Sequence, residues 1–318
     1  MNDRISRRKF LQLSGAAVGA ALLSAGCAAN SSSSAAASPP RAQPAAPAGD
    51  QAYLAAAHGT DPSAITEAAL KAVGGIERFV KSGQNVVIKP NICVDYHTAE
   101  YAATTNPEVV AALVKLCLGA GAKRVRVMDM PFGGTPESAY AITGIGEAVK
   151  AAGGEMEIMS PVKFTKTAIP NGKDIKTWAI YRDALEADVL IDLPIAKHHS
   201  LARLTLGGKN LLGLVSTPNL IHQNLGQRIA DLISVIRPTL TVVDAYRILV
   251  AHGPTGGSLN DVKAANTVIA SHDIVAADAY GATLFNLQGK DIAFVKAAAD
   301  MGLGTLDLAS VKVVEVNV

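Results

Sequence analysis

The stretch Asp188–Leu214, DVLIDLPIAKHHSLARLTLGGKNLLGL, carries the densest set of groups in the chain that could do chemistry. Within it, Lys197, His198 and His199 follow an apolar run. A neutral imidazole accepts a proton or binds a metal near pH 7, and an ammonium group attracts an anion. One histidine of the pair is then structural or exposed, and the other is a base or a metal ligand. We therefore predict a catalytic site that includes Lys197, His198 and His199.

A glycine-rich sequence, Gly207-Gly208-Lys209-Asn210, follows shortly afterwards. Backbone amides at a tight turn or a helix start can hold an anion when they have no partner in the chain. The lysine adds a positive charge to them. These four residues predict a subsite for a cofactor or a small anionic molecule. The cofactor itself stays unnamed, and a metal ion is compatible with the nearby histidines.

The elements that must position these groups begin with a buried strand. Val189–Leu193 is apolar except for Asp192, which is typical of a strand inside a parallel sheet. Pro194 offers no ladder donor, so we expect the strand to end there and residues 197–199 to lie in a loop. In open α/β sheets, ligands bind at the carboxyl edge of the strands, where this loop would lie.

Three further polar side chains stand where predicted strands end: Asn91, Asp129 and Asp244. In a parallel sheet they converge on one edge, and we place Asn91 and Asp129 in the cofactor subsite and Asp244 beside the catalytic histidines. Each aspartate orients an imidazole, or it merely caps a loop. His252, in a Gly/Pro loop, is a second imidazole that could bind a metal together with His199.

Strands and helices alternate along the body of the chain. Asp61-Pro62 and Asn106-Pro107 mark helix starts. Asn171-Gly172 indicates a hairpin, because Asn-Gly accepts the positive φ angles of a tight turn. We expect helices over residues 61–80, 107–120, 137–152, 226–236 and 274–285, hairpin strands over 164–169 and 176–181, and sheet strands over 85–89, 124–129, 155–159, 189–193, 240–243, 267–270 and 311–316. This predicts an α/β fold, a mostly parallel sheet flanked by helices in Rossmann-like layers, with a small β-hairpin insertion.

Composition restricts the class of protein. The chain has 318 residues, 49% hydrophobic and 18% charged, which is enough to bury one large core or two modest ones. Four of its basic residues lie within the first nine positions, so the rest of the chain is close to neutral although the formal net charge is +2. Binding of nucleic acid needs a concentrated basic face, so we expect none.

The N-terminus has the character of a targeting segment, assigned to residues 1–29. Ser6–Leu11, SRRKFL, and the Gly/Ala-rich apolar region after it resemble a twin-arginine export signal, with the export machinery as partner; a membrane-spanning anchor is the alternative. Leu23–Cys27 resembles a lipoprotein box, which implies a membrane tether through lipidated Cys27; ordinary cleavage near Ala25–Ala29 is the alternative. We expect a periplasmic or extracytoplasmic, membrane-anchored protein.

A Ser/Ala/Pro-rich linker over residues 30–50 separates this signal from the α/β domain, residues 51–318. Cys93 and Cys117 are the only cysteines of that domain, so we expect neither a disulfide framework nor a four-cysteine iron–sulfur site. Cys117 has helical spacing with apolar neighbours, which is typical of a buried thiol. Cys93 either packs in the core or lines the site.

Eight sequence blocks together resemble the domain of unknown function 362 family over about residues 85–290. The family's name leaves its activity undefined, and many relatives carry ferredoxin-type modules whose cysteine cluster is absent here. The blocks are VVIKPN (86–91), TTNPEVV (104–110), GAKRVRVMD (121–129), DVLIDLPIAKHH (188–199), GGKNLLG (207–213), LTVVDAYRIL (240–249), HGPTGG (252–257) and ASHDIVAADAYGATL (270–284).

A second resemblance concerns the order of a histidine, a Gly-Gly pair and a lysine. His199, Gly207, Gly208 and Lys209 are similar in order and spacing to nickel-pincer lactate racemases, in which the lysine carries the cofactor. This resemblance implies that His199 is an acid/base group and that Lys209 anchors the cofactor.

Three functions follow from these residues. The first is a metal- or cofactor-dependent enzyme that acts on a small anionic molecule by histidine acid/base chemistry. The second is a non-catalytic extracytoplasmic protein that binds a metal or a small anion with the same groups. The third is a structural role, in which the lysines and histidines lie exposed and apart. Motifs typical of dinucleotide enzymes, phosphate-loop hydrolases, zinc proteases and serine hydrolases are absent from the sequence.

Overall fold

The computed structural model describes residues 41, 43 and 51–318, all within the unit Ala36–Val318. The predicted signal segment, its Cys27 and nearly all of the linker lie outside the described residues. No helix in the described ranges combines the length and the apolar character needed to cross a bilayer.

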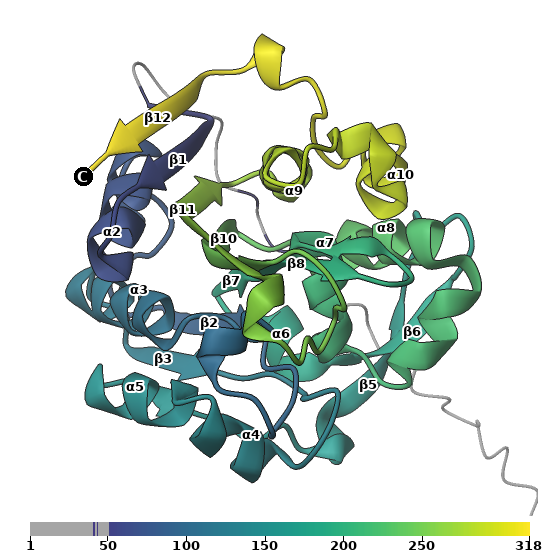
Figure 1. Cartoon of the computed structure of the whole chain (residues 1–318). Helices are drawn as coiled ribbons and strands as arrows, with labels where there is room; N and C mark the ends of the chain where they lie inside the picture. The colour runs from purple at the N-terminus through teal and green to yellow at the C-terminus, as the bar shows by residue number, and fades with distance from the viewer. Residues whose placement is uncertain (1–40, 42, 44–50) are drawn as a thin grey trace, which may run out of the picture. The chain divides into compact units, whose positions relative to one another are not determined.

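A mixed ten-stranded sheet forms the centre of the described chain (Figure 1). The pairs from β10 through β7, β2 and β3 to β4 are parallel, whereas β11 runs antiparallel to both of its neighbours. The predicted α/β fold is therefore confirmed. The order is β12 (Val313–Asn317), β1 (Leu54–His58), β11 (Val262–Ser271), β10 (Leu240–Leu249), β7 (Val189–Leu193), β2 (Asn85–Pro90), β3 (Arg124–Val127) and β4 (Glu155–Met156), with β8 (Ile195–His199) on β10 and β9 (Arg203–Thr205) on β8.

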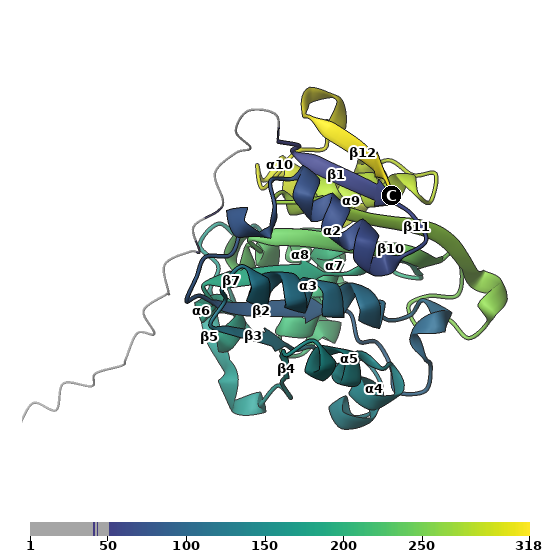
Figure 2. The ribbon, with the colours of Figure 1, turned by 90° about the vertical axis from the view of Figure 1, so that its left-hand side faces the viewer.

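Helices cover both faces of the sheet, because its strands bury both of their faces. Val86 and Ile88 of β2 pack in one apolar core, and Val87 between them packs in the other, as the two-residue period of a strand requires. On the first side lie α2 (Pro62–Ala72), α3 (Pro107–Gly119), α4 (Pro136–Ile142) and α5 (Ile145–Ala151), most of them in front of the sheet in Figure 2. On the other lie α6 (Arg182–Glu186), α7 (Gly207–Asn210), α8 (Leu225–Ile236), α9 (Ile274–Thr283) and α10 (Ala293–Asp300).

Two predicted helices are shorter than expected, because glycines interrupt them. Asp61 caps α2 as predicted, but Gly74 and Gly75 take positive φ angles and end the helix. Gly144, at a φ of 77°, divides the expected helix over residues 137–152 into α4 and α5. The cap of α3 is confirmed, since Asn106 accepts a hydrogen bond from the amide of Glu108.

The chain continues as a strand beyond Pro194, which corrects two expectations. Residues 195–199 form β8 instead of a loop, because the carbonyl of Pro194 accepts a hydrogen bond from the Asp244 amide and carries the chain along β10. For the same reason β10 is ten residues long, and Asp244 lies inside it, not at its end.

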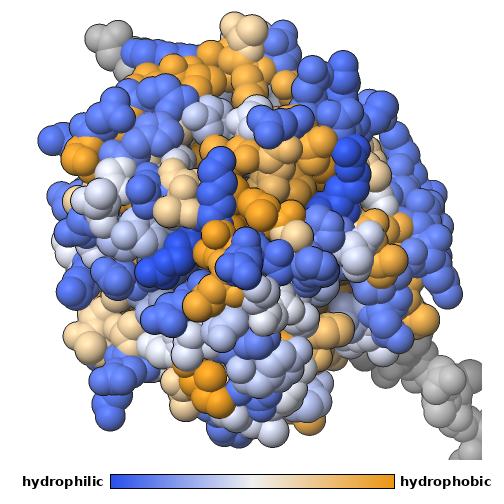
Figure 3. All heavy atoms as spheres, viewed as in Figure 1, coloured by the Kyte–Doolittle hydropathy of each residue, from blue (hydrophilic) through white to orange (hydrophobic). Residues whose placement is uncertain are grey.

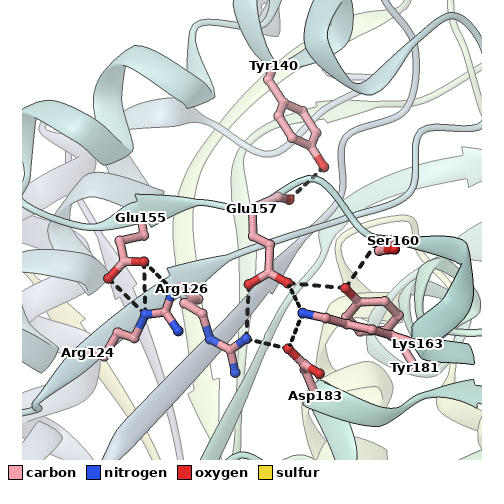
Figure 4. A network of polar contacts seen from close by, with 9 residues as sticks. All are labelled: Arg124, Arg126, Tyr140, Glu155, Glu157, Ser160, Lys163, Tyr181 and Asp183. Carbon is pink, nitrogen blue, oxygen red and sulfur yellow. Dashed lines mark hydrogen bonds and ion pairs between the residues drawn. The ribbon is translucent and has the colours of Figure 1, made fainter.

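The predicted hairpin is present as β5 (Phe164–Ala168) and β6 (Thr177–Tyr181), a separate antiparallel pair. Its loop is longer than a two-residue turn, and neither residue of Asn171-Gly172 has a positive φ. Four charged side chains tie this hairpin to the edge of the main sheet (Figure 4). The guanidinium of Arg126 lies 2.9 Å from Glu157 and 2.6 Å from Asp183, and the Lys163 amine contacts the same two carboxylates at 3.0 and 2.8 Å.

This network makes stability depend on pH. Burial raises the pKa of Glu157 and of Asp183, but hydrogen bonds from Lys163 and Arg126 outweigh it and hold both pKa values below their ordinary ones. A carboxylate with a lowered pKa stabilises the fold above its unfolded pKa, and that contribution is lost as the pH falls through the folded pKa.

We expect Arg126→Met to lower the free energy of unfolding by about 2 kcal/mol at pH 7, because two partly buried carboxylates lose a partner. The difference from the unaltered protein should shrink as the pH falls below about 4. The control is Arg124→Gln, whose pair with Glu155 is 47% and 52% exposed and should contribute less than about 1 kcal/mol. Equal urea midpoints for both variants and the unaltered protein would refute the role of the network.

Candidate functional site

A cavity of about 350 Å³ opens at the carboxyl edge of β2, β3 and β8. The segments that follow β2 and β3 form one wall, and β8, its turn into β9 and the chain from α7 to Pro218–Asn224 form the others. Six predicted site residues line this cavity: Asn91, Asp129, Lys197, His199, Lys209 and Asn210. The convergence of strand ends on one edge is thus observed for Asn91 and Asp129, and Lys209 and His199 share one cavity.

A buried ion pair forms the floor of the cavity. Lys89, at the end of β2, lies 2.8 Å from Asp129, which follows β3. Asp129 also accepts hydrogen bonds from the amides of Ile92 and Met130. Burial raises the pKa of Asp129, and the Lys89 ammonium and the two amides oppose that shift. Each of these contacts favours the charged carboxylate, but burial is the larger effect and leaves the pKa of Asp129 above its ordinary value.

Asn210 connects this floor to α7. Its side-chain oxygen accepts from the Lys89 amine at 2.7 Å and from the Asn91 amide group at 3.1 Å. Its nitrogen donates to the Lys89 carbonyl and, at 2.8 Å, to Asp192. These four hydrogen bonds are shielded from water, since their partners are buried or partly buried, and together they hold the side chain of Asn210 in one orientation.

Lys197 is a positive charge whose donors are all in use. Its amine donates to Asn91 Oδ1 at 2.9 Å and to the carbonyls of Ala103 and Pro254. An ammonium has three donors, so none remains for a ligand. Burial lowers the pKa of Lys197, while the three acceptors favour its charged form. Lys197 therefore ties together the loops around the cavity that carry Asn91, Ala103 and Pro254.

His199 presents a hydrogen-bond donor to the cavity. Its Nδ1 accepts from the backbone amides of Leu201 and Ala202, at 3.1 and 3.3 Å, so the proton of the neutral ring sits on Nε2. Within the described chain, Nε2 has no partner. Burial lowers the pKa of His199 to about 3, and the charges of Lys209 and Lys197 act in the same direction. The ring is therefore neutral across the physiological range.

Three lysine amines of the described chain line the cavity. Of these, the amine of Lys209 alone has no hydrogen-bond acceptor and no carboxylate partner among residues 51–318. Burial lowers its pKa to about 8, and the charges of Lys197 and Lys89 add to the effect. At pH 7 about one tenth of this amine is then uncharged. A neutral amine in a cavity is a nucleophile, and a charged one is an anion ligand.

The backbone that precedes Lys209 is fixed by a buried carboxylate. The amides of Gly207 and Gly208 donate to the two oxygens of Asp278 at 2.6 and 2.8 Å. The prediction that these amides bind an anionic ligand is therefore wrong. A Cβ on Gly207 would lie 2.8 Å from Asp192 and 2.9 Å from Asp278, which explains the glycine. Burial raises the pKa of Asp278 to about 7, while the two amides oppose this shift.

Two of the predicted histidines take structural positions outside the cavity lining. Nδ1 of His198 accepts from the amide of Gly253 at 3.1 Å. The side chain of His252 is 77% exposed and pairs with Asp261. His252 is thus separate from His199, and the predicted metal pair is not formed. The alternation of β8 points His198 and His199 to opposite sides, and the loop of His252 contacts His198 through the amide of Gly253.

Asp244 is also structural. Its carboxylate accepts from the amides of Asn106 and Tyr246, at 2.7 and 3.0 Å, and so ties α3 to β10. Burial raises its pKa to about 6, against these two hydrogen bonds. The predicted contact with a catalytic histidine is absent, because β10 continues past Asp244 and keeps it inside the sheet.

Three kinds of residue that line the cavity were not predicted from the sequence. Lys89 was read only as part of a strand, although a lysine in an apolar run before Pro90 is a signal of function. His222 is not among the residues predicted from the sequence, yet it lines the cavity, and burial and the charge of Lys209 lower its pKa. The walls are largely apolar, and Phe132 and Leu201 are 77% and 65% exposed at the opening. Apolar residues also gather near the middle of the face shown in Figure 3.

The donor set fits a covalently attached group better than a metal ion. The free amine of Lys209 could carry such a group. His199 would need a lone pair on Nε2 to bind a metal, which would place a proton on Nδ1 against two amide donors. Across the part of the chain that the structure describes, no three His, Cys, Asp or Glu side chains come together as a metal site.

Comparison with known proteins gives one family match and distant structural likenesses. The family model described as a domain of unknown function, DUF362, matches residues 86–283. A thylakoid-associated protein of Synechocystis is 26% identical over 249 residues, which cover 74% of this chain and 73% of that protein.

Two solved structures are similar in part. The lactate racemase apoprotein from Thermoanaerobacterium thermosaccharolyticum has a TM-score of 0.46 and 15% identity, with 71% of this chain and 55% of that one covered. A structural-genomics protein from Thermotoga maritima has a TM-score of 0.36 and 14% identity, with 58% and 51% covered. The chain spans about half the length of each.

Gly213 allows a test of the cavity floor. A Cβ there would lie 2.0 Å from Asp129 Oδ1 and 2.7 Å from the Lys89 amine. We expect Gly213→Ala to push these groups apart and to lower the free energy of unfolding by about 1 to 3 kcal/mol in urea titrations. The control, Gly119→Ala at the end of α3, meets no atom within 4 Å and should leave stability unchanged or raised. Equal stability of the two variants would contradict the close packing around the pair.

Proposed function

Because the chain belongs to the domain of unknown function 362 family, whose name assigns no activity, we propose a function from the cavity itself. The proposal is an enzyme that binds a small molecule with an anionic group and an apolar body, and that acts on it with the amine of Lys209. The observation that carries it is that this amine has no partner within residues 51–318, inside a cavity lined by two other lysines.

The charges that line the cavity support an anionic ligand. Lys89, Lys197 and Lys209 face one carboxylate, Asp129, which is already paired with Lys89. Like charges close together in a poorly solvated space repel one another, and an anion relieves that repulsion. The apolar walls, with Phe132 at the opening, support a ligand whose remaining surface is apolar.

The two imidazoles that line the cavity suit different roles. His199 offers an N–H, so it is suited to polarise an oxygen atom of the ligand and not to remove a proton. His222 has no hydrogen-bond partner within the described ranges, and its lowered pKa keeps a lone pair free at neutral pH. We therefore assign proton removal to His222 and polarisation of the ligand to His199.

A non-catalytic binding protein is the second candidate. It is favoured by the fact that Asp129, the carboxylate of the lining, is fully engaged and cannot act as a base. Substitution of His199 by Gln distinguishes the two, because a binding protein keeps most of its affinity whereas an enzyme loses turnover.

Calorimetric titration with benzoate, phenylacetate and benzyl phosphate tests anion binding. We expect at least one of them to bind, and Lys209→Met to weaken it by about tenfold or more, since removal of one buried charge–anion contact costs about 1.5 to 3 kcal/mol. Neutral benzyl alcohol should bind weakly to both. The control is Lys115→Met, a change of an exposed lysine on α3. Identical affinities in the Lys209 and Lys115 variants would reject the proposed role of Lys209.

Export by the twin-arginine route and an extracytoplasmic location are part of the proposal. The similarity to a thylakoid-associated protein supports an association with a membrane. Arg41 of the linker donates to carbonyls of Ala184, Ala187 and Ile236, at the amino ends of β7 and β10. Arg41 thus lies at the amino edge of these strands, whereas the cavity opens at the carboxyl edge.

We expect the double change Arg7→Lys and Arg8→Lys to retain the protein in the cytoplasm in cell fractionation. Cys27→Ala should leave export intact and release the protein from the membrane fraction if Cys27 is lipidated. Normal export of the double variant would rule out the twin-arginine route.

A further inference from the structure

The position of Lys209 is unusual because the backbone is fixed while the side chain is free. Asp278 holds the amides of Gly207 and Gly208, and Asn210 is held by Asp192 and by the Lys89 carbonyl. Lys209 lies between these anchors, so its amine enters the cavity from a defined point. A side chain that served only to neutralise charge would pair with a carboxylate, as Lys89 does with Asp129.

The surroundings keep this amine reactive at neutral pH. Two further ammonium groups, of Lys89 and Lys197, lie in the same lining, and the walls are largely apolar. Both conditions disfavour a third positive charge, and the pKa of Lys209 falls to about 8 as a result. A lysine that is desolvated and close to other cations is the usual form of a nucleophilic amine.

The other groups that line the cavity suit a carbonyl compound. His199 lines the cavity, its Nε2–H has no partner within residues 51–318, and the ring stays neutral, so it can donate to a carbonyl oxygen without competing for a proton. A carboxylate beside that carbonyl would meet the charges of Lys89 and Lys197. These two requirements together describe a 2-oxo acid with an apolar side chain.

We propose that Lys209 forms an imine with the carbonyl carbon of a 2-oxo acid bound in this cavity. The amine adds to the carbonyl carbon and gives a carbinolamine, whose oxygen receives a proton while nitrogen loses one. Loss of water then takes away that oxygen with both former amine hydrogens, and a C=N bond replaces the C=O bond. The step requires no oxidant or reductant. It rests on the proposed function and adds the substrate class to it.

Reductive trapping tests this proposal. The full chain is incubated at pH 7.5 with pyruvate, phenylpyruvate or phenylglyoxylate and cyanoborohydride, and the modified residue is located by peptide mass spectrometry. We expect a single adduct on Lys209. Its neutral fraction exceeds that of an ordinary exposed lysine by on the order of 100-fold, so labelling of Lys115 should lag far behind. The labelling rate should rise with pH and level off above about 8.

Two variants separate the outcomes. Lys209→Arg keeps the charge and cannot form an imine, so it should bind 2-oxo acids in calorimetry without a trapped adduct, and Lys209→Met should lose both. Thermal unfolding confirms that each variant is folded. Binding of the 2-oxo acids without an adduct on Lys209, or equal labelling of Lys209 and Lys115, overturns the imine and leaves the proposed function in place. Absence of both binding and adduct overturns the proposed function as well.

Discussion

The structure depends on the burial of three like-charged amines at one edge of a parallel sheet. Each amine is accommodated in a different way. Lys89 is paired with Asp129 at 2.8 Å, and Lys197 directs its three donors to Asn91 and two backbone carbonyls. Lys209 has no such partner among the described residues, and its pKa falls to about 8. The first two lysines thus hold the loops in place, and their charges add to the effect of burial in lowering the pKa of the third.

The elements around the cavity are fixed by buried polar contacts whose partners come from distant parts of the chain. Asp278 in α9 accepts both glycine amides of α7, and Asp244 in β10 accepts the amide that begins α3. Burial of a carboxylate lowers the stability of the fold and raises the pKa of that carboxylate, as it does for Asp278 and Asp244. Hydrogen bonds from the backbone amides of α7 and of Asn106 offset this cost and fix the position of those segments. The same contacts occupy the oxygens of these carboxylates, so the groups that we propose to act on a ligand are Lys209, His199 and His222.

The sequence was sufficient to predict the fold class and the edge at which the cavity lies, because apolar strand runs that end in polar residues are local signals. Asn91 and Asp129 were found in this way. The roles of Gly207, Gly208 and Asp244 were not predictable, because they depend on long-range partners that no local pattern reveals. Pro194 misled the prediction for a different reason, since a proline that donates nothing can still accept a hydrogen bond and continue a sheet. His222 was missed because neither a strand nor a glycine motif marks its position.

The most direct test of the account is the titration of Lys209 itself. In protein with isotope-labelled lysine, the side-chain resonance that disappears in Lys209→Arg is followed by NMR between pH 6 and 11. The account predicts a midpoint near 8 for this resonance, with the exposed lysines still charged there. A midpoint near the ordinary 10.5 would show that the amine is solvated or paired, and would contradict the proposed site.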